Sequence, residues 1–443
     1  MKINPPKLVA LLAFTLVTAA ATPLAAQTKY KAAGDDAEIK VGNIMPYTGP
    51  AAAYGLIGRT IAAYFKKINA EGGIDDRKIN FISYDDSYDP AKAIQAARTL
   101  VEDDQVLLVF QSLGTLSNTA IQKYLNARKV PQLFVASGAT KWDDPDHYPW
   151  TMGWQPNYQT EGRIFGQYLL ENHPHDRIAI LYQNDDYGKD YVKGLKDSLA
   201  GAVPVIAEAA YETTDPDVNA QMAKLKASGA DIFFNVATPK FAAQAIRRAA
   251  EIGWKPLQML NSVSNSVGSV LKPAGLDNAQ GILTANYMKE PGDPLWKDDP
   301  AYKEWLDFMD RYFPDGDKNN TLSVYGYSVA QTLVYVLRQC GDQLTRENVM
   351  KQAANLKGVQ LGMLLPGILN VSPNLLRRQL YVRPRSSSIV YRKPPRLIAS
   401  VSRVISAASS SFRCGDAPSS QCIDMSAVGA LADVTRTSGM GRI

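Results

Sequence analysis

The sequence predicts an α/β protein of two doubly wound lobes, each a parallel sheet covered by helices on both faces. Short apolar runs typical of buried strands alternate with segments of helical periodicity, in units of about 30 residues. This alternation pauses at Gly153–Pro156 and then starts again, which indicates two lobes of similar plan. A hydrophobic content of 46% is enough for two large cores.

The first lobe is expected to begin with a strand whose apolar residues alternate with polar ones from Glu38 to Ile44. Later runs rich in Ile, Val, Leu and Phe read as buried parallel strands, and the segments between them have apolar residues at helical spacing. We expect strands at 38–44, 79–84, 106–110 and 132–136, and helices at 60–70, 90–102 and 117–127.

The second lobe repeats this pattern. We expect helices at 159–171, 190–199, 219–227 and 240–252, and strands at 177–182, 203–207 and 230–235. Two later helices, 301–312 and 323–340, have no new buried strand between them. The chain is therefore expected to return to the first lobe there.

The N-terminus has the layout of a secretory signal peptide over residues 1–26. Lys2 and Lys7 precede an apolar run at 8–21, and small residues follow, with cleavage near Ala26 or after Ala21. The run is shorter than the roughly 20 residues that span a bilayer. No cysteine follows it, so we expect an exported, soluble protein without a lipid anchor.

The net charge of +5 arises in the C-terminal part of the chain. Residues from Leu369 onward carry 11 basic and 3 acidic side chains, which leaves 37 basic and 40 acidic ones before them. The body therefore gives no reason to expect nucleic acid or an acidic membrane as partner. Of the three cysteines, Cys340, Cys414 and Cys422, none forms a recognisable disulfide framework.

No catalytic pattern occurs in the sequence. The chain has three histidines and no nucleophile elbow, zincin, phosphate-loop or CxxC motif. The acidic pairs at 85–86 and 185–186 are expected to cap loops rather than to bind a metal, and His173 and His175 lack a third ligand nearby. We therefore expect neither an enzyme nor a cofactor or metal.

Parallel sheets of this kind bind ligands beyond the carboxyl ends of their strands, so two facing lobes form a cleft. The loops expected there are rich in small polar and aromatic residues, at 47–54, 111–117, 137–140, 184–187 and Thr238.

Several spaced motifs make the sequence similar to a known family. They are Gly42–Pro50 followed by Tyr54-Gly55, Ile68–Ile74, Tyr84–Pro90, Ser137–Thr140 and Asn184–Gly188. In this order they resemble the periplasmic branched-chain amino acid (Leu/Ile/Val) binding proteins of ABC importers, over residues 38–374.

The resemblance implies a type I periplasmic-binding fold, with two Rossmann-like lobes joined by a hinge that the chain crosses three times. It places the first lobe at 38–156 plus 287–363 and the second at 157–286 plus 364–374. It also implies a periplasmic monomer that captures a small-molecule ligand and, once closed, docks on a membrane permease.

The resemblance also implies ligand-binding residues. The family's binding loop falls on residues 113–115 and its carboxylate site on Thr115 with residues 138–140, while aromatic rings line the cleft. The candidate set is Tyr54, Leu113, Gly114, Thr115, Gly138, Ala139, Thr140, Tyr187, Thr238 and Ser262. The alternative for Thr115 and Thr140 is helix capping, and for Tyr54 and Tyr187 core packing.

Three departures from the family pattern bear on the ligand. Gly114 stands where the family has a serine, Ala237 or Thr238 stands where it has an aromatic residue, and no carboxylate is present at Ser262-Val263 to pair with an ammonium. A buried ammonium without a partner is costly. The ligand is a branched-chain or hydrophobic amino acid or, as we favour, an aromatic or branched organic acid lacking an amine.

Residues 375–443 do not resemble the family. They are basic, rich in Ser and Arg, without a sustained period, and we expect them to be disordered. One hypothesis is that the reading frame was lost near Asn374, which would leave the second lobe without its closing strands; the alternative is a basic arm that contacts a polyanion. Two other functions remain: a ligand-sensing regulator, disfavoured by the signal peptide, and a non-functional product.

Overall fold

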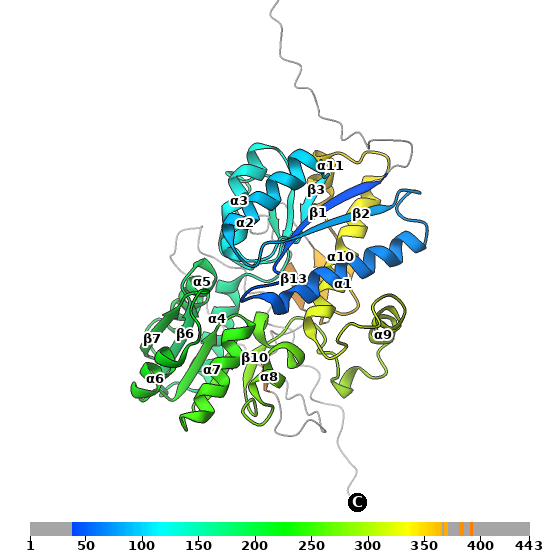
Figure 1. The fold of residues 1–443 in the computed structure, drawn as a ribbon. Helices are drawn as coiled ribbons and strands as arrows, with labels where there is room; N and C mark the ends of the chain where they lie inside the picture. The colour runs from blue at the N-terminus through cyan, green and yellow to red at the C-terminus, as the bar shows by residue number, and fades with distance from the viewer. Residues whose placement is uncertain (1–37, 366, 371–380, 385–389, 393–443) are drawn as a thin grey trace, which may run out of the picture.

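The computed structural model describes residues 38–365, 367–370, 381–384 and 390–392. It contains two parallel sheets with helices on both faces, which confirms the expected α/β fold of two doubly wound lobes (Figure 1). The sheet of the first lobe has the order β2-β1-β3-β4-β5. Its strands are β1 Ile39–Met45, β2 Ile79–Asp85, β3 Leu108–Phe110, β4 Gln132–Val135 and β5 Thr151–Gly153.

The second lobe repeats this strand order as β7-β6-β8-β9-β10. Its parallel strands are β6 Ile178–Gln183, β7 Val205–Tyr211, β8 Ile232–Val236, β9 Leu257–Leu260 and β10 Leu283–Ala285. The sequence analysis missed β5, β9 and β10. Each has only three or four residues, and each includes a polar one, so none of them forms a long apolar run.

Helices cover the first sheet much as expected. They are α1 Gly55–Ala70, α2 Pro90–Arg98 and α3 Thr115–Ala127, with short turns η1 Ala52–Tyr54, η2 Thr99–Asp103 and η3 Thr140–Trp142. Helix α1 begins five residues before the expected Thr60, because η1 leads directly into it and its first turn buries Leu56 and Ile57. This earlier start places Tyr54 at the beginning of a helix that borders the cleft.

The helices of the second lobe are α4 Tyr158–Asn172, α5 Asp186–Leu199, α6 Asn219–Ala227 and α7 Pro239–Glu251, followed by η4 Ser262–Ser264, η5 Val267–Leu271 and α8 Lys272–Ala274. Side chains of Asn157 and Asp185 accept hydrogen bonds at the starts of α4 and α5. Such caps satisfy backbone N–H groups that the helix itself leaves free.

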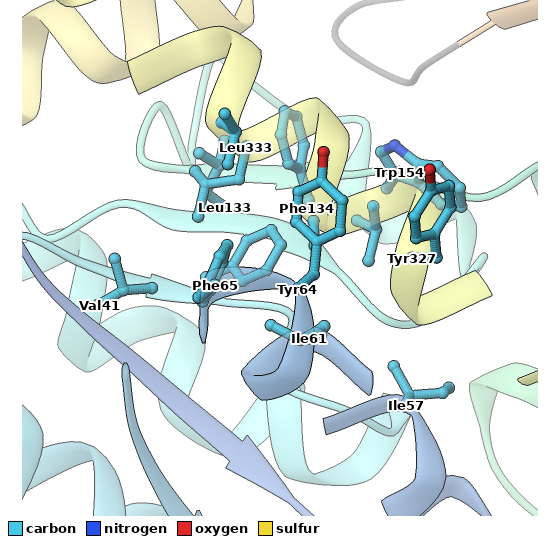
Figure 2. Packing of buried hydrophobic residues seen from close by; sticks show 14 of the residues in the cluster. Val41, Ile57, Ile61, Tyr64, Phe65, Leu133, Phe134, Trp154, Tyr327 and Leu333 are labelled. Atoms are coloured by element: carbon cyan, nitrogen blue, oxygen red, sulfur yellow. The ribbon is translucent and has the colours of Figure 1, made fainter. Parts of the chain in front are cut away.

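The chain then returns to the first lobe, as expected. Its buried residues on α9 Pro300–Tyr312, α10 Thr321–Cys340 and α11 Arg346–Ala353 share one hydrophobic cluster with α1 and the first sheet. Figure 2 shows this core, where Ile61, Tyr64 and Phe65 of α1 lie among side chains of β4 and α10. The rings of Tyr64 and Tyr327 meet edge to face at 5.2 Å.

Helices α1 and α10 can pack closely because residue 326 of α10 is a glycine. A Cβ atom there would lie 2.8 Å from the backbone oxygen of Ile57 on α1. The two helices run side by side in Figure 1, and they hold the C-terminal part of the described chain against the N-terminal part. Among the described helices, none is long and apolar enough to cross a membrane.

Among the described residues, two continuous segments connect the lobes. The chain leaves the first lobe after β5 and returns after β10, where Tyr287–Lys289 runs antiparallel to Met363–Leu365. Trp154, in the first crossing, donates a hydrogen bond of 3.2 Å from its indole to Thr332 of α10 and packs edge to face on Tyr325. This residue therefore braces the crossing.

The structure differs from expectation in the segment 375–443. Strand β11 Val359–Gln360 pairs with β12 Gly367–Asn370, which pairs with β13 Tyr381–Pro384, and β14 Val390–Arg392 pairs antiparallel with β10. A free edge of β10 offers unpaired backbone groups, and a short stretch of β-prone residues satisfies them. The rest of that segment, and the expected signal peptide at 1–26, lie outside the described residues.

Candidate functional site

The strand order of each sheet fixes where a ligand site can form. In both lobes the order reverses beside the first strand, between β1 and β3 and between β6 and β8. Loops leaving neighbouring strands on opposite sides open a crevice at such a point. Here the loops after β1 and β3 face those after β6 and β8 across the gap between the lobes, and together they line a single cavity.

Seven of the ten candidate residues from the sequence line this cavity. They are Tyr54, Leu113, Gly114, Thr115, Tyr187, Thr238 and Ser262. The enclosed space measures about 50 Å³, which is room for a few water molecules. A ligand of amino-acid size therefore requires the lobes to separate slightly or the walls to shift. That these residues contact ligand remains a prediction.

The other three candidates, Gly138, Ala139 and Thr140, do not line the cavity. Ala139 is fully buried. The backbone N–H and the hydroxyl of Thr140 donate to one carboxylate oxygen of Asp190 on α5, at 2.7 and 2.9 Å. Gly138 packs against residues 156–158, and its oxygen accepts from the Tyr158 backbone at 2.8 Å. In this structure the segment joins the two lobes rather than facing the cavity.

The cavity wall also contains residues that the sequence analysis did not select. Four are tyrosines, namely Tyr88, Tyr158, Tyr287 and Tyr325. Tyr88 follows β2 in the motif Tyr84–Pro90, so its position at the carboxyl end of a strand was a usable signal. The other three come from the beginning of α4, the second connection between the lobes and helix α10, where only the tertiary structure places them beside the cleft.

Tyr88 enters the cavity through an unusual turn. Ser87 and Tyr88 both have positive φ angles, of 50° and 62°, which are uncommon for residues with side chains. The ring then lies over Gly114, where a Cβ atom would stand 2.4 Å from Tyr88 Cε2. Gly114 itself has φ +98°. The absence of a side chain at position 114 is therefore what makes room for the Tyr88 ring.

Several wall hydroxyls already have partners. Tyr54 donates to the backbone oxygen of Val263 across the cleft at 3.1 Å, and Tyr325 donates to Gln155 Oε1 at 3.0 Å. The hydroxyls of Thr115 and Ser137 lie 2.8 Å apart. Because burial raises the pKa of Tyr54, Tyr88 and Tyr187 well above the usual tyrosine value, these phenols are neutral.

No charged side chain lines the cavity within the described part of the chain. Carboxylates stand one layer behind its walls and bond to lining residues; Glu290, for example, accepts from the Thr321 hydroxyl at 3.1 Å. Glu161 of α4 accepts from the backbone N–H and the hydroxyl of Ser262, at 2.7 and 2.5 Å, and from the Tyr191 hydroxyl at 2.7 Å. Burial raises the pKa of Glu161 to about 7, although these hydrogen bonds oppose the shift.

Asp185 is another carboxylate behind the wall. It caps α5 by accepting from the Gly188 backbone at 3.2 Å and from Gln183 Nε2 at 2.8 Å. Burial raises the pKa of Asp185 to about 6, partly offset by those hydrogen bonds. The pair at 85–86 likewise accepts from loop backbone and hydroxyl groups. Asp85, Asp86 and Asp185 therefore act as caps, whereas Asp186 pairs with Lys141 at 3.0 Å.

Among the described residues no group of three or more His, Cys, Asp or Glu side chains could hold a metal ion. His173 lies 2.9 Å from Asp176, close to the end of α4, where the two form a local pair. The walls thus offer hydroxyl, amide and aromatic groups, which suit reversible binding of a small molecule.

Known binding proteins resemble this chain in sequence. A protein named Leu/Ile/Val-binding protein homolog 1 from Brucella abortus is 26% identical over 334 residues, 73% of this chain and 85% of the relative. The leucine-, isoleucine-, valine-, threonine- and alanine-binding protein of Pseudomonas aeruginosa is 26% identical over 223 residues, 48% of this chain and 57% of the relative. By their names, these relatives are binding proteins.

Solved structures share the fold. A substrate-binding periplasmic protein from Ralstonia solanacearum superposes with a TM-score of 0.71 at 24% identity, covering 80% of this chain and all of that one. A branched-chain amino acid ABC transporter protein from Thermus thermophilus with bound valine gives 0.69 at 15% identity, over 77% and 91% of the two chains. The family model described as periplasmic binding protein matches residues 38–374. This chain therefore belongs to the periplasmic binding protein family.

Proposed function

We propose that the protein is the extracytoplasmic receptor of an ABC importer and captures a small, largely apolar carboxylate ligand by closure of its two lobes. The mature protein works in the periplasm as a soluble monomer, and its closed form docks on a membrane permease. The names of the relatives and the expected signal peptide support this assignment.

The composition of the cavity wall is the main support for the proposed ligand class. Six tyrosines and several hydroxyl and amide groups line it, and the described lining residues include no charged side chain. An ammonium group would lose its hydration there without meeting a carboxylate directly, whereas a carboxylate can be held by hydroxyl and N–H donors. An aromatic or branched acid without an amine therefore fits better than an α-amino acid.

A thermal-shift and calorimetry panel tests this proposal. Leucine, 4-methylpentanoate and 4-methylpentanamide share one carbon skeleton and differ in the ammonium and the carboxylate; phenylalanine, phenylpropionate and its amide form the aromatic series. A ligand at 100 times its Kd stabilises the native state by about 2.7 kcal/mol. We expect one of the amine-free acids to raise the melting temperature most.

A matched pair of variants locates the binding in the cavity. Thr115 lines the cavity, whereas Thr119, one turn further along α3, is exposed and donates to the Thr115 backbone oxygen. Thr115→Ala should weaken binding of the best ligand and Thr119→Ala should not. A cooperative melt that no member of the panel shifts would reject the proposed ligand class.

A further inference from the structure

The direction of hydrogen bonds around the cavity points to a property of the ligand. A phenol hydroxyl has one proton to donate and lone pairs to accept. Where a neighbouring amide already donates to the oxygen, the proton remains for another acceptor. The wall tyrosines can therefore be sorted by whether their protons are already used.

Two wall tyrosines have used their protons. Tyr54 donates to the Val263 backbone oxygen and Tyr325 donates to Gln155 Oε1. Both acceptors lie within the protein, so these hydroxyls have no proton left for a ligand. They serve to hold the walls together.

Tyr187 is in the opposite situation. Its oxygen lies 2.9 Å from Asn261 Nδ2, and the same nitrogen faces the backbone oxygens of Asn235 and Ala237 at 3.1 and 3.3 Å. Two carbonyl oxygens can only accept, so they fix the nitrogen end of the Asn261 amide in this place. An amide nitrogen does not accept, and the described residues offer the Tyr187 proton no other acceptor. The proton is left for the cavity.

Gln183 fixes the direction of the hydrogen bond at the Tyr88 hydroxyl in the same way. The Gln183 nitrogen donates to the Asp185 carboxylate at 2.8 Å, and its oxygen accepts from the Tyr211 hydroxyl at 3.1 Å. Reversing the amide would set its oxygen against a carboxylate, so the nitrogen end faces Tyr88, 3.4 Å from its hydroxyl oxygen. Within the described chain the Tyr88 proton likewise has no acceptor.

Ser262 differs from Tyr88 and Tyr187, because it faces the cavity as a hydrogen-bond acceptor rather than as a donor. Its hydroxyl donates to Glu161, so the oxygen can accept one hydrogen bond from a ligand. An ammonium has three protons to place. One serine oxygen does not satisfy it, and Glu161 itself stays behind the wall.

We propose that Tyr88 and Tyr187 are donors that recognise an acceptor group of the ligand, a carboxylate or carbonyl oxygen, and that Gln183 and Asn261 are positioning residues that keep both phenols as donors. Tyr158 accepts from an amide nitrogen in the same way, from Gln155 Nε2 at 3.2 Å, and can add a third donor. This inference rests on the proposed function of the cleft. It places the recognition of the acceptor group at residues outside the segment 138–140 that the sequence analysis favoured.

Calorimetric affinities of the purified mature protein for 4-methylpentanoate, its amide and leucine test the inference. Tyr88→Phe and Tyr187→Phe keep the rings and remove only the donors, so each should weaken acid binding about 10- to 100-fold, as for loss of a hydrogen bond to a charged group. Tyr54→Phe is the matched control, because its hydroxyl is already used. It should change all three affinities by one common factor.

Gln183→Glu and Asn261→Asp test the positioning role. Each replaces a donor with an acceptor of the same size, so the facing tyrosine turns its proton away from the cavity. Acid affinity should then fall about tenfold, as it does when the phenol is removed. Circular dichroism checks the fold of each variant, and if an acidic variant does not fold, the two phenylalanine variants decide.

The inference is overturned if Tyr88→Phe and Tyr187→Phe leave acid affinity within twofold, or weaken it no more than Tyr54→Phe does. It is also overturned if a folded Gln183→Glu or Asn261→Asp variant keeps the wild-type affinity for the acid. If the wild-type protein binds no member of the branched or the aromatic series, the proposed function fails and the inference fails with it.

Discussion

At the scale of single residues, the cleft depends on a few positions whose side chains cannot be exchanged freely. Gly114 has no side chain, and the Tyr88 ring occupies the space where one would lie. Glu161 accepts two hydrogen bonds from Ser262, although burial disfavours the charged form of Glu161. In the sequence, Gly114 was visible only as a departure from a family pattern, and Glu161 was an ordinary helical residue. Their roles follow from neighbours that are distant along the chain.

Gly114→Ala should disable the site. A methyl group there would stand 2.4 Å from the Tyr88 ring, and alanine is strained at φ +98°. Gly72→Ala is a matched control, because Gly72 has φ +112° with no atom within 4 Å of the added Cβ. Both variants should melt lower than wild type, but only Gly114→Ala should lose ligand binding, by about tenfold or more. Equal affinities of the two variants would contradict this.

Glu161→Gln should change how stability depends on pH. A buried Glu161 with pKa of about 7 keeps its proton in the native state between its ordinary value, near 4.5, and 7, while the unfolded state has released it. The free energy of unfolding therefore falls as pH rises through this window, by at most about 1.4 kcal/mol per unit.

In Glu161→Gln this loss should disappear, so the variant gains stability relative to wild type between pH 5 and pH 8. Melting temperatures of both proteins across this range measure the difference. Asp185 contributes with the same sign in both proteins and cancels in the comparison. Parallel pH curves for the two proteins would show that Glu161 does not titrate in this range.

At the scale of helices and strands, the prediction from sequence succeeded where a segment is long and its pattern strong. The strands β1, β2, β6 and β8 have five to seven residues each and were recognised, as were the amphipathic helices. The three- and four-residue strands β5, β9 and β10 were missed because their pairing comes from neighbours in the sheet rather than from their own residues.

Strand β14 offers a test at this scale. It pairs with residues 283–285 of β10 and so covers an edge of the second sheet. A chain that ends at residue 384 lacks β14, whereas a chain that ends at residue 395 keeps it. We expect the shorter chain alone to melt at a lower temperature and to aggregate on heating, because an uncovered edge strand pairs with other chains.

Differential scanning calorimetry and light scattering on both truncated chains and the full chain measure this. If all three melt alike, residues beyond 384 contribute nothing to stability, and the hypothesis that the reading frame was lost near Asn374 gains support. If both truncated chains melt lower by the same amount, the contribution comes from beyond residue 395 rather than from β14.

At the scale of the whole molecule, the lobes are held together by contacts on two sides of the cavity. Tyr54 bonds to Val263 across the cleft, and Thr140 bonds to Asp190 at the start of α5. The sequence allowed the prediction that the loops at the carboxyl ends of the strands in the two sheets face each other. Seven of the ten candidate residues line the cavity. Thr140 bonds to a carboxylate of the opposite lobe, and contact of residues 138–140 with ligand remains a prediction.

Asp190→Ala should therefore loosen the closed form. The variant loses two hydrogen bonds from Thr140 and one of 2.7 Å from Gln159, so the equilibrium between open and closed lobes moves toward the open form. The apparent affinity for a ligand that binds the closed form falls in proportion to the closed fraction. A shift of about 1.4 kcal/mol corresponds to a tenfold loss. The radius of gyration of the unliganded protein, measured by small-angle X-ray scattering, should rise.

Asp197→Ala on the same helix is the control, because Asp197 pairs with Lys193 on its own helix and bonds to no residue of the first lobe among those described. Saturating ligand should bring the Asp190→Ala variant back to the wild-type radius, since ligand binding favours closure. A radius and an affinity equal to those of Asp197→Ala would mean that Tyr54 and the hinge alone keep the lobes closed. In that case the contact between Thr140 and Asp190 would be a consequence of closure rather than one of its causes.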